Sequence, residues 1–324
     1  MRFIIYGAGG IGCVVGGHMA RTGHDVTLIG RPSHARAINE HGLRLVTPTG
    51  VHTLPIPAVT SPAQADISAD DVVFFCMKGQ DMTEAIRSLK EVVNEVPVFC
   101  FQNGVRNEEI ACQYFSSVYG VMVRVGAVYL TDGEVTARRD PPGWLAIGRY
   151  PQGSDELVDI VAESLRTASF FVRATPDVMP YKWGKLMVNL ANAVGAITNI
   201  RGDDVAPIVS AARNEFQEIL AEAKISWVSQ DELADGWPEV SAPLRGQLDI
   251  EAQSSTWQSL ARKQGNVETE FLNGEVVRLA KKLGRQAPIN EALLHISQKM
   301  ANNHELPGKY TPVELSSLLG LTNP

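Results

Sequence analysis

The sequence predicts two domains: an α/β domain with a doubly wound, Rossmann-like parallel sheet, then a mainly helical, all-α domain. Two observations predict the first domain: short apolar runs alternate with helical segments, and a glycine cluster directly follows the first run. A third predicts the second domain, because strand-like runs stop beyond residue 176 and long segments of helical period take over. We therefore expect domains at residues 1–176 and 177–324, each long enough to bury a core.

The strands of the first domain are expected in short, apolar runs, as in parallel sheets covered on both faces. The predicted strands are 2–6, 25–29, 71–77 and 97–101, with helices at 11–21 and 83–93 between them. A β-rich stretch follows, and its predicted elements are strands at 120–130, 134–138 and 145–148, a helix at 154–168 and a strand at 170–172.

The second domain is expected to contain four long helices. Residues with helical period occupy 181–198, 208–223, 268–283 and 287–302. The stretch 229–243, rich in Asp, Glu, Trp and Pro, is expected to be a surface connection between them.

Composition excludes several classes of protein. With 44% hydrophobic and 20% charged residues, the chain has the composition of a folded protein and not of a disordered one. A net charge of -7 argues against a nucleic-acid partner, and no apolar run is long enough for a membrane span. The amino terminus lacks a secretory signal pattern, and the four cysteines form no Cys-x-x-Cys pair and show no metal-ligand spacing. We therefore expect a reduced, cytoplasmic protein without a metal site.

A glycine motif after the first predicted strand predicts a dinucleotide site. It reads Gly7-Ala8-Gly9-Gly10-Ile11-Gly12, the pattern G-x-G-x-x-G. Gly7 is expected to make the tight turn, Gly9 to let the backbone approach the pyrophosphate, and Gly12 to let the helix pack on the strand. The N–H groups at the start of the helix would bind the phosphates. Such glycines often mark only a turn, but the strands before and after them favour the binding function.

The end of the second predicted strand favours NADPH over NADH. NAD-selective sites usually place an acidic residue there, to accept hydrogen bonds from the ribose hydroxyls, whereas this chain has Gly30 and Arg31. A guanidinium can bind a 2′-phosphate through two hydrogen bonds. The alternative is a solvated loop arginine.

Four local motifs, in their order along the chain, resemble those of the ketopantoate reductase (2-dehydropantoate 2-reductase) family. They are Met77-Lys78-Gly79-Gln80, Phe101-Gln102-Asn103-Gly104, Lys182-Trp183-Gly184-Lys185-Leu186-Met187-Val188-Asn189 and Val267-Glu268-Thr269-Glu270-Phe271-Leu272-Asn273-Gly274. The resemblance implies a helical domain similar to the C-terminal domain of 6-phosphogluconate dehydrogenase. It also implies NADPH-dependent reduction of 2-dehydropantoate, or of a closely related small 2-oxo acid, to the 2-hydroxy acid, a step of pantothenate biosynthesis.

Lys78 and Asn103 follow predicted strands of the sheet, where ligands of open α/β sheets bind. Lys78 is expected to contact the cofactor, and Asn103 the cofactor or the substrate carbonyl. For Asn103 a turn is the alternative function, because Asn-Gly is itself a turn signal.

Lys185 is the predicted catalytic residue. Hydride transfer to a ketone leaves an alkoxide, which needs a proton and a nearby positive charge, and a lysine ammonium supplies both. Asn189, four residues on, shares its helix face, and Asn192 lies roughly 20° from Lys185 around a continuous helix. Both amides are expected to contact the substrate. The alternative is that this polar stripe is the exposed face of the helix.

The resemblance also assigns Ser255 to the substrate carboxylate and Glu268 to a substrate hydroxyl. Their alternative functions are structural: Ser254 or Ser255 as a helix cap, and Glu268 as an acid in a first helical turn. This chain departs from the family at Ala193, where a second asparagine is usual, and in a spacing from Ser255 to Glu268 that is one residue longer.

Three hypotheses follow. The first is reduction of ketopantoate in a cleft between the domains; the second is the same reaction on a different 2-oxo acid, motivated by Ala193. The third is a regulatory protein that senses NADP without turnover. A homodimer through amphipathic helices of the second domain is possible in each case, although a buried core face has the same pattern.

Overall fold

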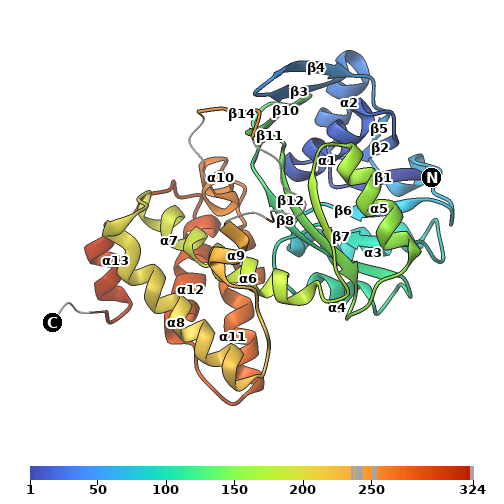
Figure 1. The fold of residues 1–324 in the computed structure, drawn as a ribbon. Coiled ribbons are helices and arrows are strands. Elements are labelled where there is room, and N and C mark those ends of the chain that lie inside the picture. The colour runs from blue at the N-terminus through green and yellow to red at the C-terminus, as the bar shows by residue number, and fades with distance from the viewer. Residues whose placement is uncertain (235–236, 238–243, 250–253, 322–324) are drawn as a thin grey trace. The chain divides into compact units, whose positions relative to one another are not determined.

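The computed structural model describes residues 1–234, 237, 244–249 and 254–321. They form two compact units: Met1–Lys182 with Asp231–Ile250, and Trp183–Gln230 with Glu251–Pro324. The first unit contains the sheets and the second is helical, so the predicted fold class is confirmed (Figure 1). The segment 231–250 is grouped with the first unit, although it lies well beyond residue 176, where we expected the domains to divide.

An eight-stranded sheet organises the first unit. Its strands, in spatial order, are β13 (Phe171–Ala174), β12 (Gly143–Arg149), β8 (Val118–Val125), β7 (Val98–Cys100), β6 (Val72–Phe75), β1 (Arg2–Tyr6), β2 (Asp25–Ile29) and β5 (Ala58–Val59). The six strands from β8 to β5 are parallel, and their order is the one typical of dinucleotide-binding sheets. Strand β12 runs antiparallel to β8.

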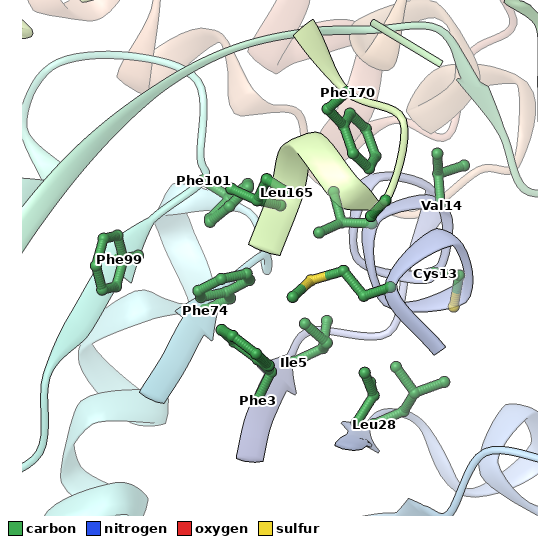
Figure 2. Close-up of a cluster of buried hydrophobic side chains, with 14 of the residues drawn as sticks. Phe3, Ile5, Cys13, Val14, Leu28, Phe74, Phe99, Phe101, Leu165 and Phe170 are labelled. Atoms are coloured by element: carbon green, nitrogen blue, oxygen red, sulfur yellow. The ribbon is translucent and has the colours of Figure 1, made fainter. Parts of the chain in front are cut away.

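Alternate residues of the strands pack against helices on opposite faces of this sheet. Phe3 and Ile5 of β1 face α1 (Gly10–Arg21), α2 (Pro32–His41) and α5 (Glu156–Thr167). Ile4, between them, faces α3 (Met82–Lys90) and α4 (Asn107–Ala111). Figure 2 shows the first of these cores, where the Phe74 and Phe101 rings stack with their centroids 4.5 Å apart. Covering both faces explains why the strands are apolar throughout.

The first unit contains a second sheet and a helix that the sequence patterns did not predict. A second sheet is formed by β4 (Gly50–Leu54), β3 (Leu43–Thr47), β10 (Glu134–Ala137) and β9 (Ala127–Val128), in that order. Helix α2 was missed because only three of its ten residues are buried, which leaves a weak apolar pattern.

The second unit is built from helices. They are α7 (Ala191–Thr198), α8 (Ala206–Glu222), α10 (Ser255–Ala261), α11 (Asn273–Lys282), α12 (Pro288–Asn302) and α13 (Pro312–Leu318), with short 3-10 helices η3 (Asp203–Val205) and η4 (Glu268–Phe271). Helix α6 (Met179–Asn189) begins in the first unit and ends in the second. Two predicted helices are divided: 181–198 at Leu190, and 268–283 at Leu272, whose φ of -116° and ψ of -95° are not helical. None of the described helices is both long and apolar enough to cross a membrane.

The expectation of a surface connection at 229–243 is wrong for its described part. Residues Gln230–Ala234 form α9, and the Leu233 and Trp237 side chains are 5% and 2% exposed. Trp237 lies under the Arg173 guanidinium, 4.5 Å from ring centroid to Cζ. Farther on, β14 (Gly246–Gln247) pairs with β11 (Arg139–Asp140) of the first unit. The many acidic and proline residues of this stretch gave it a polar pattern, so the burial of Leu233 and Trp237 was not predicted. Residues 235–236 and 238–243 lie outside the described part.

Candidate active site

The glycine loop after β1 has the three properties that its motif predicts. Gly7 has a φ of +110°, and a Cβ there would lie 2.2 Å from the backbone nitrogen of Met77, so only glycine fits the turn. A Cβ on Gly12 would lie 2.3 Å from the Gly7 carbonyl oxygen, because the helix packs closely on the strand. A Cβ on Gly9 would meet nothing within 4 Å. Open space at Gly9 is what a phosphate needs in order to approach the backbone.

Gly9 is also the N-cap of α1, and no side chain caps this helix. The first N–H groups of a helix have no partner within the helix, and they attract anions. A dinucleotide phosphate therefore fits the donors at the start of α1.

The sheet brings the other predicted cofactor residues to the edge that carries Gly7. Strands β1, β2, β6 and β7 end in register, since Tyr6 pairs with both Ile29 and Phe75, and Phe75 pairs with Cys100. The residues that follow these ends are Gly7, Arg31, Lys78 and Asn103. Arg31 is exposed and is the N-cap residue of α2. Lys78 and Asn103 are partly buried.

A buried ion pair under the loop after β7 was not predicted as part of the site. Lys182 and Glu108 are 2% and 0% exposed on their side chains, and the Lys182 ammonium donates to Glu108 Oε1. Burial raises the pKa of Glu108, and the positive charge of Lys182 opposes this rise. Lys182 is the first residue of the motif Lys182–Asn189, but its partner is 74 residues away in the sequence, so no local pattern could reveal the pair.

The same ammonium holds the backbone next to Asn103. Lys182 Nζ lies 3.4 Å from the Cys100 carbonyl oxygen and 3.2 Å from that of Gln102. The Asn107 side-chain amide donates to the Asn103 carbonyl oxygen at 2.9 Å. Three carbonyl groups around the end of β7 are therefore fixed by side chains, which orients the loop that presents Asn103.

The polar stripe on α6 is not the exposed face of the helix. Asn189 is 5% exposed, and Lys185 is partly buried. A solvated stripe would be open along its length, so burial argues against the structural alternative.

The structure divides the predicted helix at Leu190, between α6 and α7, but Leu190 itself keeps helical dihedral angles, with φ of -58° and ψ of -29°. The angle between Lys185 and Asn192 therefore stays a prediction. Asn192 is partly buried, whereas Ala193 is 1% exposed and belongs to the hydrophobic core of the second unit.

The two neighbouring serines have different roles. Ser254 is the N-cap of α10, and its Oγ accepts a hydrogen bond from the Trp257 N–H at 3.2 Å. The Ser254 hydroxyl also lies 3.5 Å from the Asn192 carbonyl oxygen, which brings α10 close to α7. Ser255 Oγ is buried and has no hydrogen-bond partner among the residues that the structure describes. A buried hydroxyl without a partner is costly, so Ser255 is the better candidate for contact with a ligand.

Glu268 is buried, at 4% exposure, and is the first residue of η4. The alternative function for Glu268 was a solvated acid in the first turn of a helix. A carboxylate with so little access to water does not fit that function. Lys185, Asn189, Asn192, Ser255 and Glu268 all belong to the second unit, whereas the glycine loop, Arg31, Lys78 and Asn103 belong to the first.

Two protein-family models match the chain, and together they cover most of it. "Ketopantoate reductase PanE/ApbA" matches residues 3–152, and "Ketopantoate reductase PanE/ApbA C terminal" matches residues 177–301. A 2-dehydropantoate 2-reductase of Pyrococcus horikoshii is 30% identical over 297 residues, which cover 90% of this chain and 94% of that protein. The corresponding protein of Archaeoglobus fulgidus is 28% identical and covers 91% and 96%.

Solved structures are similar over the same length. A PanE/ApbA family ketopantoate reductase from Ralstonia eutropha has a TM-score of 0.79 at 28% identity, covering 94% of this chain and 99% of that one. D-mandelate dehydrogenase with NADH and anilino(oxo)acetate has a TM-score of 0.78 at 19% identity, with 94% and 100% covered. At that identity the likeness concerns the fold alone.

Proposed function

The chain belongs to the ketopantoate reductase family, and we propose that it reduces 2-dehydropantoate to pantoate with NADPH as a cytoplasmic enzyme of pantothenate biosynthesis. It is an oxidoreductase that acts on a CH–OH group and uses a nicotinamide cofactor. The observation that carries the proposal is the burial of the α6 stripe, where Asn189 is 5% exposed and Lys185 is partly covered. A polar stripe withdrawn from water on an otherwise apolar helix is suited to bind a polar substrate.

Lys185 is the proposed general acid. A reduced nicotinamide bound at the glycine loop would supply the hydride for the keto carbon, and the electron pair of the C=O bond would move to oxygen. The Lys185 ammonium stabilises this developing charge and transfers its proton to the oxygen, which gives the hydroxyl group. The lysine then regains a proton from solvent.

Hydrogen-bonding groups orient the substrate in this proposal. The buried Ser255 hydroxyl binds the substrate carboxylate, and Asn103, Asn189 and Asn192 contact its polar groups. The buried Glu268 accepts a hydrogen bond from the distal hydroxyl. Arg31 follows the end of β2, where no acidic residue stands, and this supports a preference for the 2′-phosphate of NADPH. Lys78 and the glycine loop bind the rest of the cofactor.

A second candidate is the same reduction of a different small 2-oxo acid. Ala193 is buried in the hydrophobic core, so no amide from this position reaches a substrate. D-mandelate dehydrogenase, which shares the fold, was solved with NADH and anilino(oxo)acetate, an oxo acid without the pantoate skeleton. Sensing NADP without turnover is disfavoured, since the curated relatives are named as reductases.

The proposal is tested by following NADPH oxidation with ketopantoate and a panel of other 2-oxo acids. We expect ketopantoate to give the highest kcat/KM. Lys185→Ala should lower kcat by about 100- to 10,000-fold, because the proton donor is lost, with NADPH affinity nearly unchanged. Lys282→Ala, on the exposed surface of α11, is the matched control.

Each outcome decides between the candidates. A Lys185→Ala enzyme with wild-type kcat contradicts the catalytic assignment. Higher kcat/KM for another oxo acid transfers the function to the second candidate, and tight cofactor binding without turnover of any oxo acid favours the sensor.

A further inference from the structure

The hairpin that joins β9 to β10 packs against α1 and α2, the helices that follow strands β1 and β2. A Cβ on Gly10, the first residue of α1, would lie 3.3 Å from the Ala127 Cβ and 3.8 Å from the Tyr129 Cβ. A Cβ on Gly133 would lie 3.1 Å from the Ala37 Cβ in α2. The segment 127–133 therefore packs beside the ends of β1 and β2.

This packing is secured by a buried histidine. Gly133 N–H donates to His34 Nδ1 at 2.9 Å, so this ring nitrogen carries no proton. Its other nitrogen, Nε2, lies 3.2 Å from Cys13 Sγ in α1. The His34 side chain is 0% exposed, and burial lowers its pKa. His34 is therefore neutral, and it joins α1, α2 and the hairpin without adding a charge.

The hairpin places a carboxylate at the first turn of α2, whose N-cap residue is Arg31: Asp132 Oδ1 lies 3.8 Å from His34 Nδ1. Asp132 accepts a hydrogen bond from the Tyr129 hydroxyl at 2.7 Å. This bond and the positive charge of Arg31 lower the pKa of Asp132. The Asp132 side chain is 43% exposed, so it is charged at neutral pH and open to a ligand.

The end of β2 thus lacks an acidic residue, but in the folded protein Asp132 lies at the start of α2, the helix that follows this strand. We propose that Asp132 is a determinant of cofactor choice, which weakens the preference for NADPH that Arg31 alone would give. This inference rests on the proposed nicotinamide site and deepens it.

Two physical effects give Asp132 this role. Its charge repels the 2′-phosphate of NADPH and partly neutralises Arg31. The ribose 2′-hydroxyl of NADH is a donor and gains an acceptor in the same carboxylate. Both effects act on the ratio of the two affinities.

The test is titration of the full-length protein with NADPH and with NADH, without substrate, to obtain the ratio of their dissociation constants. Asp132→Asn should shift this ratio about tenfold toward NADPH, equivalent to about 1.4 kcal/mol. The shift should shrink as salt is raised, because Asp132 is exposed. Asp159→Asn, an exposed acid on α5 with the same change in net charge, is the control and should leave the ratio unchanged.

An Asp132→Asn ratio within twofold of wild type overturns the inference, as does a shift toward NADH, which would mean that Asp132 positions Arg31 for the phosphate. Arg31→Ala should shift the ratio toward NADH. Because the titration needs no turnover, it is independent of the substrate assignment. A chain that binds neither cofactor refutes the nicotinamide site itself, and with it both proposals.

Discussion

Helices α1 and α10 both begin beside proposed ligand sites, and their N-termini are built in opposite ways. Helix α1 begins after Gly9, with no side-chain cap and open space around the glycine. Helix α10 begins after Ser254, whose hydroxyl caps the helix, while the next hydroxyl, that of Ser255, has no partner in the described part of the chain. An uncapped start keeps backbone donors for an anion. At a capped start, a side chain already occupies a backbone N–H group of the helix. A ligand is then bound by the neighbouring side chain instead.

Replacing glycines of the Gly7–Gly12 motif at the start of α1 should give the largest effects. Gly7→Ala should cost about 5 kcal/mol of unfolding free energy or more, since the φ of +110° and the contact with the Met77 nitrogen both exclude a Cβ. Gly9→Ala should leave stability within about 0.5 kcal/mol, yet weaken NADPH binding about 100-fold by filling the phosphate space. Urea unfolding and cofactor titration measure the two effects; equal stability losses would contradict the roles assigned.

The ion pair beneath Asn103 should give the next largest effect. Lys182→Met leaves the Glu108 carboxylate buried without its cation, which should cost about 3–5 kcal/mol in urea unfolding. Combining it with Glu108→Gln should recover part of the loss. Arg87→Met, which removes an exposed pair with Glu84, is the control and should cost less than about 1 kcal/mol. A Lys182→Met loss no larger than that of the control would show that the pair does not hold the loop.

The two serines should give smaller effects that separate cleanly. Ser254→Ala should cost about 1 kcal/mol of stability through the lost cap. Ser255→Ala should change stability little but raise KM for the oxo acid about tenfold or more, because a hydrogen bond to a charged carboxylate is lost. Thermal unfolding and steady-state kinetics on both variants test this. If Ser254→Ala carries the KM effect instead, the assignment of the hydroxyls is reversed.

The sequence was informative where a function depends on neighbours along the chain. β1 and β2 were predicted with the bounds observed, because covered parallel strands are continuously apolar. The glycine motif gave the conformational requirements of Gly7 and Gly12, since both follow from a strand, a turn and a helix within twelve residues. The motif pattern also gave the family, which the comparisons confirm.

Details of the helical unit were less predictable. The predicted stripe continues through Leu190, where α6 ends and α7 begins, and periodicity in the residues does not mark this boundary. Ser254 and Ser255 are equivalent in the sequence as cap candidates; only the observed start of α10 distinguishes them.

By itself, the sequence determined the first strands of the nucleotide unit's sheet, the helical character of the second unit, and the chemistry available at each motif, because local periodicity and backbone preferences act over a few residues. Only the tertiary structure decided which distant groups meet: Asp132 near His34, Lys182 against Glu108, Trp237 under Arg173. Such contacts arise from packing between segments far apart in the chain, and no local pattern records them.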